Sequence, residues 1–439
     1  MSIEFGNHGM YEDFNPCGSI SHVNRRTLLK MAGLSGVSWL TPAAELLANP
    51  SDAVRHHQQA TNLIVLWLQG GPSQLETFDP HGGKDIAGGT KSIQTSAKGI
   101  EFAEGMEQTA EIADALTVIR NVVSKEGDHE RAVYNIKTGF RPDPTLQHPA
   151  IGAVMCHHFD DPNVEIPRHV SILAGQWSAR GGYLGNQFDA FRSGDPLKRQ
   201  GDLERRVSKE RFDQRLESLS VVEKSFSRGR IKKLAEKTAH SSTIERAVQM
   251  MSSEQLAAFD LKALPKEEQS YCGDTPFGRG CVAAARLVEV GVRCVEVTLR
   301  GWDTHANNHD FCTANKKILD PALAGLIRYL KERSLFEKTM VVVGGEFGRT
   351  PQVTPGTGGR EHWPHGFSMV MAGGGLPGGH VIGETDPEGS RIKFAEGTPV
   401  ENVHATILHR LGIDFERELD TPVGRPMKIS EGVVIKELA

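Results

Sequence analysis

An uninterrupted apolar run rich in branched side chains, residues 62–68 (NLIVLWL), stands near the start of the main part of the chain. A strand with one solvated face alternates apolar and polar side chains, so a continuous run indicates a strand buried on both faces. It leads into Gln69 and a glycine-rich turn at residues 70–73. A strand of this kind requires a layered fold, because helices must cover the sheet from either side.

Five further apolar runs predict buried strands, and amphipathic patterns between them predict helices. The alternation of strands and helices predicts an α/β fold with a mostly parallel central sheet and helices on both faces. In such sheets the working site lies at the carboxyl ends of the strands. The predicted strands are residues 116–119, 169–173, 292–299, 339–344 and 367–372, and the predicted helices are 131–138, 276–290, 318–333 and 400–411.

The chain divides into a leader, a linker and one large domain. Residues 1–48 read as a targeting segment, 49–61 as a polar linker, and 62–439 as the α/β domain. Residues 202–237 are dense in Arg, Lys and Glu, with Leu, Val and Ile at helical spacing. We therefore expect a helical insertion at about residues 200–270, with its charges on a solvated face.

The leader carries paired arginines, Arg25 and Arg26, followed by an apolar stretch at residues 31–40 and small residues to about Ala48. This order is typical of a twin-arginine export signal. We expect the chain to be a client of the twin-arginine translocase and to work in the periplasm or outside the cell. The alternative is a basic amphipathic helix at the N-terminus. The apolar stretch falls short of the roughly 20 residues that cross a bilayer.

Composition excludes several classes of protein. The formal net charge of −5 and a pI near 6.4 give no reason to expect nucleic acid or an anionic membrane surface as a partner. No apolar stretch of membrane-spanning length follows the leader. The six cysteines form no CxxC or other close metal-type spacing, so we interpret them as buried thiols.

Four polar loops follow predicted strands and hold the candidate site residues. The first contains Ser73, Glu76 and Asp79. The second, residues 127–131, opens a helix, and the third, residues 301–309, follows the strand that ends at Leu299. The fourth, residues 345–365, runs from Glu346 and Arg349 through a glycine-rich stretch to a histidine-rich end.

A divalent cation needs carboxylate oxygens and neutral imidazole nitrogens that converge from different segments. Asp303 and His305, with Glu346 and then His362 or His365, would supply that mixture from two adjacent strand ends. The alternative for each residue is structural, because an Asp-x-His is often a capped turn and a histidine beside tryptophan is often a packed ring.

The leader and the motifs GGPSQLETFDP, GWDTHANN, GGEFGRTP and GREHWPHGFSMVMAGGG resemble an exported bacterial family known as domain of unknown function 1501. The resemblance runs from about residue 20 to the C-terminus. That family is similar in fold to the alkaline phosphatase and sulfatase superfamily, whose members hydrolyse phosphate or sulfate esters with bound divalent metal.

The resemblance implies a divalent metal (zinc, calcium, manganese or iron) held by Asp303, His305, Glu346 and His362. Phe347 stands where the superfamily usually has a ligating His or Asn, so that ligand is missing or comes from His365 or His309. The early acidic ligand falls near Gln69 and Gly70. Glu76 or Asp79 would have to replace it.

The nucleophile is the larger departure from the superfamily pattern. Aligned on Lys137–Gly139, His129 occupies the place of the modified cysteine of sulfatases, and no Ser or Thr stands between Gly127 and Ile136. His129 could act as nucleophile or general acid, or only bind the anion at the helix N-terminus. Asp128 beside it could be only the helix cap. Arg349 or Arg360 would hold the anion by a forked contact.

These observations predict an exported metal-dependent hydrolase acting on a sulfated or phosphorylated substrate outside the cytoplasm. The alternative from another class is a catalytically inactive binding or scaffold protein on the same fold. A redox or nucleotide-binding protein is disfavoured, because the glycines at 373–375 lack the GxGxxG spacing and are followed by a proline at 377. They predict a chain reversal instead.

Overall fold

The computed structural model describes residues 59–198, 203, 206–228, 240–385 and 396–439. All of them belong to one compact unit, which spans Gln58–Ala439. The leader, the first residues of the linker and Cys17 lie outside the described residues.

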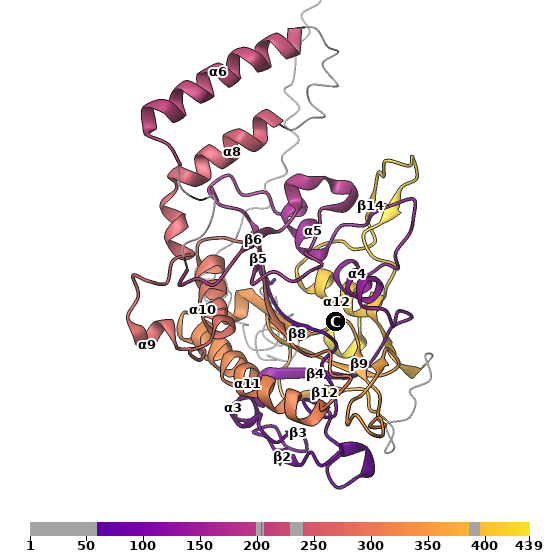
Figure 1. The fold of residues 1–439 in the computed structure, drawn as a ribbon. Coiled ribbons are helices and arrows are strands. Elements are labelled where there is room, and N and C mark those ends of the chain that lie inside the picture. The colour runs from indigo at the N-terminus through magenta and orange to yellow at the C-terminus, as the bar shows by residue number, and fades with distance from the viewer. Residues whose placement is uncertain (1–58, 199–202, 204–205, 229–239, 386–395) are drawn as a thin grey trace, which may run out of the picture. The chain divides into compact units, whose positions relative to one another are not determined.

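Within the described chain, the main sheet has nine strands in the order β12-β4-β11-β8-β1-β7-β5-β6, and β13 also pairs with β4 (Figure 1). All six apolar runs form strands of this sheet. Its strands are β1 (Asn62–Gln69), β4 (Leu116–Val123), β5 (His169–Ile172), β6 (Phe191–Ser193), β7 (Cys294–Arg300), β8 (Thr339–Gly344), β11 (Phe367–Gly373), β12 (His380–Ile382) and β13 (Thr398–Pro399).

The sheet is mostly parallel, as the sequence predicts, but it is mixed. β1 pairs in parallel with β7 and β8, and β5 pairs in parallel with β6 and β7. β11 runs antiparallel between β4 and β8. The loop at residues 345–366 begins and ends at the carboxyl edge of the sheet. β11 therefore starts at the edge where β8 ends and runs in the opposite direction.

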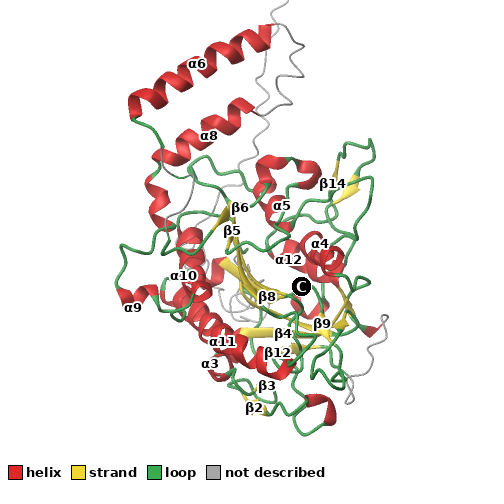
Figure 2. Ribbon diagram, in the orientation of Figure 1, coloured by secondary structure: helices red, strands yellow, loops and turns green. Residues whose placement is uncertain are grey.

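Helices cover both faces of the sheet, which confirms the α/β prediction (Figure 2). Alternate residues of β1 point to opposite sides. Ile64, Leu66 and Leu68 join the core under α10 (Pro276–Glu289) and α11 (Asn308–Glu332), and Leu63 joins the core under α5 (Ile151–His158) and α12 (Val400–Arg410). β8 is buried along its whole length and β7 is buried as far as Leu299, so both strands that flank β1 belong to the core.

The helix α4 (His129–Thr138) begins at the second polar loop. Asp128 is its N-cap, since its side chain accepts a hydrogen bond from the Arg131 amide, and Gly139 ends it in the left-handed region. The cap therefore sets His129 at the first position of the helix, at the carboxyl end of the sheet.

The helix α11 begins ten residues before the predicted start. The apolar pattern begins at Ile318, but the structure extends the helix to Asn308 and buries Asn308 and Lys316 in its first turns. The Lys316 ammonium donates to the carbonyl oxygen of Glu104 (2.6 Å), which a search for apolar periodicity cannot detect. His309 therefore lies on a helix, where the sequence had suggested a loop.

The segment expected to be helical contains α6 (Lys209–Arg228) and α8 (His240–Ser252) (Figure 1). No α6 side chain from Lys209 to Lys224 is buried, which agrees with the solvated charges predicted there. The other elements of the described chain are short: β2 (Ser92–Gln94), β3 (Glu101–Ala103), β9 (Gly348–Arg349), β10 (His362–Trp363), β14 (Glu418–Leu419), β15 (Met427–Lys428), α3 (Glu107–Glu111) and α9 (Lys266–Gln269).

The five cysteines among the described residues are free and buried, as predicted. Burial raises the pKa of the Cys156 and Cys312 thiols to about 12, so both are neutral and inert. Gly373, the last residue of β11, and Gly374 and Gly375 in the turn after it all adopt positive φ, which confirms the predicted chain reversal. Among the helices described, none has the length and apolar character needed to cross a membrane.

Candidate metal centre

The candidate site lies at the carboxyl ends of β7 and β8 and at the first turn of α4. Asp303 follows β7 and Glu346 follows β8, and both strands flank β1. The turn after β1 passes between them: a Cβ on Gly70 would lie 2.4 Å from the Asp303 amide nitrogen. Gly70 also has a φ of +119°, so only glycine allows this close approach.

The hairpin of β9 and β10 closes the site from the other side. In its antiparallel register His362 lies opposite Arg349. This pairing brings the end of the glycine-rich loop back over β8 and sets His362 against His129, with ring centroids 4.4 Å apart. The sequence could show that both segments are polar, but not that this short hairpin joins them.

Three imidazoles in this cluster are each held by the Nδ1 atom. Each partner is a carbonyl or carboxylate oxygen that accepts hydrogen bonds, so Nδ1 carries the proton and Nε2 presents a lone pair. The three contacts are His129 Nδ1 to Glu346 Oε1 (2.8 Å), His305 Nδ1 to Glu361 Oε2 (2.7 Å) and His362 Nδ1 to the Gly127 carbonyl oxygen (2.8 Å).

The three Nε2 atoms converge on the carboxylate of Asp303. They lie 3.3 Å (His129), 3.0 Å (His305) and 3.5 Å (His362) from its oxygens. The Nε2 atoms of His305 and His362 are only 3.2 Å apart. Two lone pairs at that distance repel unless a proton or a cation lies between them, so the arrangement fits a bound metal ion.

The donor atoms of His129, Asp303 and His362 all lie within 4.8 Å of one another. His305 borders this group through its contacts with Asp303 and His362. The cluster is open on one side, because the side chains of Asp303 and His305 are 48% and 44% exposed. A ligand could therefore approach the group from solvent.

Glu346 supports this group from below and is fully buried. Its Oε1 accepts hydrogen bonds from His129 Nδ1 and from the Gly70 amide (3.0 Å), whereas its buried Oε2 has no hydrogen-bond partner in the part of the chain that the structure describes. Burial alone would lower the pKa of His129, but the carboxylates of Glu346 and Asp303 raise it above the ordinary value. In this arrangement Glu346 orients His129, where the sequence had suggested a direct metal ligand.

Arg349 is fully buried and holds Asp303. Its Nη2 donates to Asp303 Oδ1 (2.7 Å) and to the Gly70 carbonyl, and its other nitrogens donate to the carbonyls of Gly71 (3.0 Å) and Arg360 (3.0 Å). Burial acts to raise the pKa of Asp303, but the hydrogen bond and charge of Arg349 lower it overall. Arg349 therefore positions the Asp303 carboxylate. Its guanidinium is engaged by protein acceptors, so the forked contact with a substrate anion that the sequence predicted does not fit this structure.

Arg360 is also engaged within the protein. Its guanidinium donates to Glu76 Oε1 (2.8 and 3.1 Å) and to the carbonyls of Thr350, Pro351 and Ile86. All five of its N–H groups thus face protein acceptors, so Arg360 offers none to an anion. Glu76, 1% exposed, is its buried partner.

The remaining candidates lie outside the cluster. Asp79 pairs with Arg120 (3.3 Å) and accepts a hydrogen bond from Thr385. Asp128 caps α4, as its alternative interpretation predicted. His309 Nδ1 contacts the Thr90 hydroxyl (3.2 Å), and the His365 ring packs edge-on against Trp363.

Two aromatic residues frame His129: Phe347, which the sequence marked as standing in place of a metal ligand, and Trp177, which the sequence did not single out. Phe347 is buried, and its ring centroid lies 5.0 Å from that of His129 and 4.3 Å from that of His362. Trp177 is partly exposed, and its ring is nearly parallel to His129 at a centroid distance of 6.2 Å. Trp177 lies in the loop after β5, and residues 174–188 contain no acidic residue or histidine, so a search for metal ligands passes over this loop.

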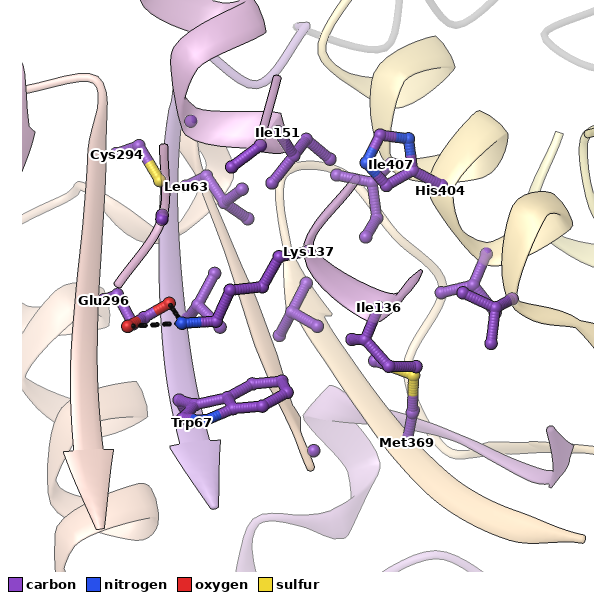
Figure 3. Close-up of a pocket in the computed structure, with 18 of the residues that line it drawn as sticks. Leu63, Trp67, Ile136, Lys137, Ile151, Cys294, Glu296, Met369, His404 and Ile407 are labelled. Atoms are coloured by element: carbon purple, nitrogen blue, oxygen red, sulfur yellow. Dashed lines mark hydrogen bonds and ion pairs between the residues drawn. The ribbon is translucent and has the colours of Figure 1, made fainter. Parts of the chain in front are cut away.

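Lys137 and Glu296 form a buried ion pair (Figure 3), and Lys137 also contacts the Trp177 segment. Lys137 Nζ lies 2.7 Å from Glu296 Oε2, donates to the Trp177 carbonyl (3.0 Å), and sits over the face of Trp67. Glu296 also accepts from the Ser171 hydroxyl (3.1 Å). These groups border a mostly apolar cavity between the sheet and α4, α5 and α12, which His169 and His404 also line.

Comparison with protein families gives one match, to the family described as "Protein of unknown function (DUF1501)", over residues 60–439. A search of curated proteins by sequence finds no match.

Among solved structures the chain is similar to the PsFucS1 sulfatase from Pseudoalteromonas sp., at a TM-score of 0.40 and 12% identity, covering 82% of this chain and 69% of that one. It is also similar to the alkaline phosphatase from the Antarctic bacterium TAB5, at a TM-score of 0.35 and 14% identity, covering 81% and 99%. At these TM-scores the likeness carries no argument about function, which depends on the chain's own residues.

Proposed function

We propose that this chain, which belongs to the family described as protein of unknown function (DUF1501), is a metal-dependent hydrolase of phosphate or sulfate esters. One observation carries the proposal: three imidazoles, each anchored through Nδ1, direct Nε2 to the single carboxylate of Asp303. Metal-ligating histidines in proteins are anchored in this manner, by an acceptor on the nitrogen that does not bind the metal.

The proposed ligands are His129, Asp303, His305 and His362. A set of three nitrogens and one carboxylate suits zinc, iron or manganese better than calcium, which prefers six to eight oxygen ligands. His362 supports this assignment further, since burial lowers its pKa and keeps the imidazole neutral near pH 7. A neutral imidazole is the form that binds a metal.

The protein's own residues would prepare the site for an ester. Glu346 fixes the His129 ring, and Arg349 fixes Asp303 while compensating its charge. When bound, the cation would supply Lewis-acid charge to the ester oxygen. Both nitrogens of His129 face carboxylates, so we assign His129 to the ligand set and water to the role of nucleophile.

The test is elemental analysis of the purified protein by mass spectrometry. We expect stoichiometric zinc, iron or manganese in the wild-type protein and its loss in an Asp303→Ala/His305→Ala double variant. His365→Ala is a matched control, because this ring packs on Trp363 outside the cluster. A well-folded wild-type protein that binds no divalent metal would overturn the assignment.

The second candidate is a binding or scaffold protein without turnover. Phe347 packs against the His129 and His362 rings, and Arg349 and Arg360 are occupied within the protein, so neither clamps an anion. Both candidates predict a bound metal and differ in chemistry. Release of phenol from phenyl phosphate or phenyl sulfate, lost in the double variant, supports the hydrolase; metal-dependent binding of phosphate without release supports the scaffold.

We further propose export of the folded chain by the twin-arginine route, on the basis of Arg25, Arg26 and the apolar stretch after them. Export after folding would allow the metal to be bound in the cytoplasm. Replacement of both arginines by lysine should retain the protein in the cytoplasmic fraction, and unchanged secretion would contradict this route. The substrate would then lie outside the cytoplasm.

A further inference from the structure

An open cleft lies beside the candidate metal centre, at the carboxyl ends of β5, β6 and β7. Its described lining comprises Leu173, Ala174, Arg192, Ser193, Gly194, Thr298 and Arg300. Arg300 is the last residue of β7, three positions before Asp303. The two sites therefore share one edge of the sheet, where ligands of open α/β sheets bind.

The separation of the sites follows from the order of the strands. The metal cluster is centred over β1, between the ends of β8 and β7, and the cleft is centred over β5, between β7 and β6. Neighbouring strands are about 4.8 Å apart, so the two centres are about 10 Å apart. The Trp177 loop follows Ala174 and lies between them, with its ring against His129.

The cleft is positively charged. Arg192 and Arg300 line it, and none of its described lining residues is acidic. Arg300 Nη2 donates to the carbonyl oxygen of Ala174, which fixes the guanidinium at the mouth of the loop after β5. A guanidinium has five N–H donors, so the remaining ones can meet an anion in a forked contact.

A buried hydroxyl in the cleft points independently to a polar ligand. Thr298 is 3% exposed, and its Oγ1 has no hydrogen-bond partner among the described residues. A buried hydroxyl without a partner is costly unless a ligand or water satisfies it. Thr298 lies on the same face of β7 as Arg300, two residues before it, so its hydroxyl can serve the group that the arginine binds.

We propose that Arg192, Arg300 and Thr298 form a second anion subsite, so that the substrate is a polyanion carrying a further sulfate, phosphate or carboxylate about 10 Å from the ester that is cleaved. The inference that the substrate is a polyanion rests on the proposed hydrolase function. The anion subsite itself does not rest on it, because its residues would bind an anion whether or not the metal centre catalyses hydrolysis.

The test uses the full-length protein with its metal removed by chelation, so that neither turnover nor the cation contributes. Fluorescently labelled dextran sulfate is titrated at low ionic strength, where exposed charges are least screened. We expect Arg192→Gln/Arg300→Gln to weaken binding at least tenfold. Arg417→Gln/Arg425→Gln is the control, since it removes the same charge from two exposed arginines elsewhere.

The expected control change is below twofold. Arg192→Lys/Arg300→Lys should recover part of the affinity, because lysine keeps the charge but lacks the fork. Equal losses in the two glutamine variants would show only general electrostatic attraction and would overturn the subsite. Absence of binding by the wild-type protein would overturn it too. If the variants bind dextran sulfate as expected but the metal-loaded protein hydrolyses neither phenyl phosphate nor phenyl sulfate, only the hydrolase function is refuted.

Discussion

At the scale of single residues, the candidate centre depends on atoms that face away from it. Each of the three imidazoles presents Nε2 because an acceptor holds its Nδ1. Two of these acceptors are glutamates in different surroundings: Glu346 is fully buried and Glu361 is exposed. A buried acceptor cannot be replaced by water, so Glu346 should matter more to the metal site than Glu361.

The first prediction compares these two carboxylates. Glu346→Gln should weaken metal affinity about tenfold to a hundredfold, the range typical of residues that orient a metal ligand. Glu361→Gln should cause a clearly smaller loss, because water can replace the exposed partner of His305. Competition with a metallochromic chelator measures both constants. Equal affinities in the wild-type and Glu346→Gln proteins would show that His129 needs no such support.

The second residue-scale prediction concerns pH. His404 is buried beside the apolar cavity, and burial lowers its pKa from 6.5 to about 4. Between these values the unfolded chain binds the proton and the folded chain does not, so stability rises with pH across that window. The linked contribution is about 3 kcal/mol, lost as the pH falls from 7 toward 4.

The variant His404→Leu should therefore lose less stability on acidification than the wild-type protein. Urea denaturation at pH 7.5 and pH 5 gives the two free energies of unfolding for each protein. His148 and His169 also have pKa values lowered by burial, so a residual slope is expected. Identical pH slopes in the two proteins would mean that His404 is protonated or solvated in the folded state.

Sequence reasoning could identify which residues belong near the site but not their individual roles. Asp303 and His305 follow an apolar run in a polar loop, and that signal is local. The role of Arg349 depends on carbonyls at Gly70 and Gly71, more than 270 positions away. Its burial, which removes the anion contact expected of it, arises from tertiary packing that no local pattern encodes.

At the scale of elements, α4 joins the candidate centre to the buried ion pair. His129 is at its N-terminus and Lys137 is in its last turn, where it meets Glu296 of β7 (Figure 3). The same strand leads to Asp303. The pair therefore links the helix and the strand that deliver two proposed metal ligands, and its ammonium also anchors the Trp177 loop.

The third prediction is that Lys137→Met destabilises the protein by about 3–5 kcal/mol, because it leaves the Glu296 carboxylate buried without a counter-charge. Lys137→Met/Glu296→Leu should recover most of that loss, since it removes both charges from an apolar surround. Lys262→Met is the control, because Lys262 is exposed and such changes usually stay within about 0.5 kcal/mol. Urea denaturation measures all three.

A Lys137→Met loss no larger than that of the control would mean that water enters the cavity and solvates Glu296. The double variant also tests the anchor. The chain has five tryptophans, so the Trp177 signal is taken as the difference from the same protein carrying Trp177→Phe. If the ion pair positions Trp177, quenching of that signal by iodide should rise in both Lys137 variants while the fold is retained.

Element positions were largely predictable, whereas strand direction was not. A run such as residues 367–372 is apolar because it is buried on both faces, and burial is the same for either direction of the chain. β11 is antiparallel because the loop before it stays at the carboxyl edge of the sheet and does not return to the amino edge. The early start of α11 escaped detection because its first buried residues include polar ones: Asn308 accepts a hydrogen bond from Thr304, and Lys316 donates to the distant carbonyl of Glu104.

At the scale of the whole molecule, a metal that binds only the folded chain adds to its stability by mass action. At a free concentration one hundred times the dissociation constant, the gain is about 2.7 kcal/mol. For a domain of this size that gain corresponds to a rise in Tm of about 3 °C. Under the proposed export route, a chain that is exported folded must also keep its metal in the new compartment.

The fourth prediction is that metal raises the Tm of the chelated protein by about this amount, and that the Asp303→Ala/His305→Ala variant shows no rise. The choice of metal affects the size of the change, because the five buried thiols become exposed on unfolding and bind zinc in the unfolded chain. Manganese binds thiolates weakly and so stabilises the unfolded chain less than zinc does. When each metal is present at the same multiple of its dissociation constant, manganese should therefore raise the Tm more than zinc. Calorimetry with each metal, with His365→Ala as the control, measures the difference. An equal rise in the double variant would place the metal elsewhere, and the convergence of imidazoles on Asp303 would then be held by protons alone.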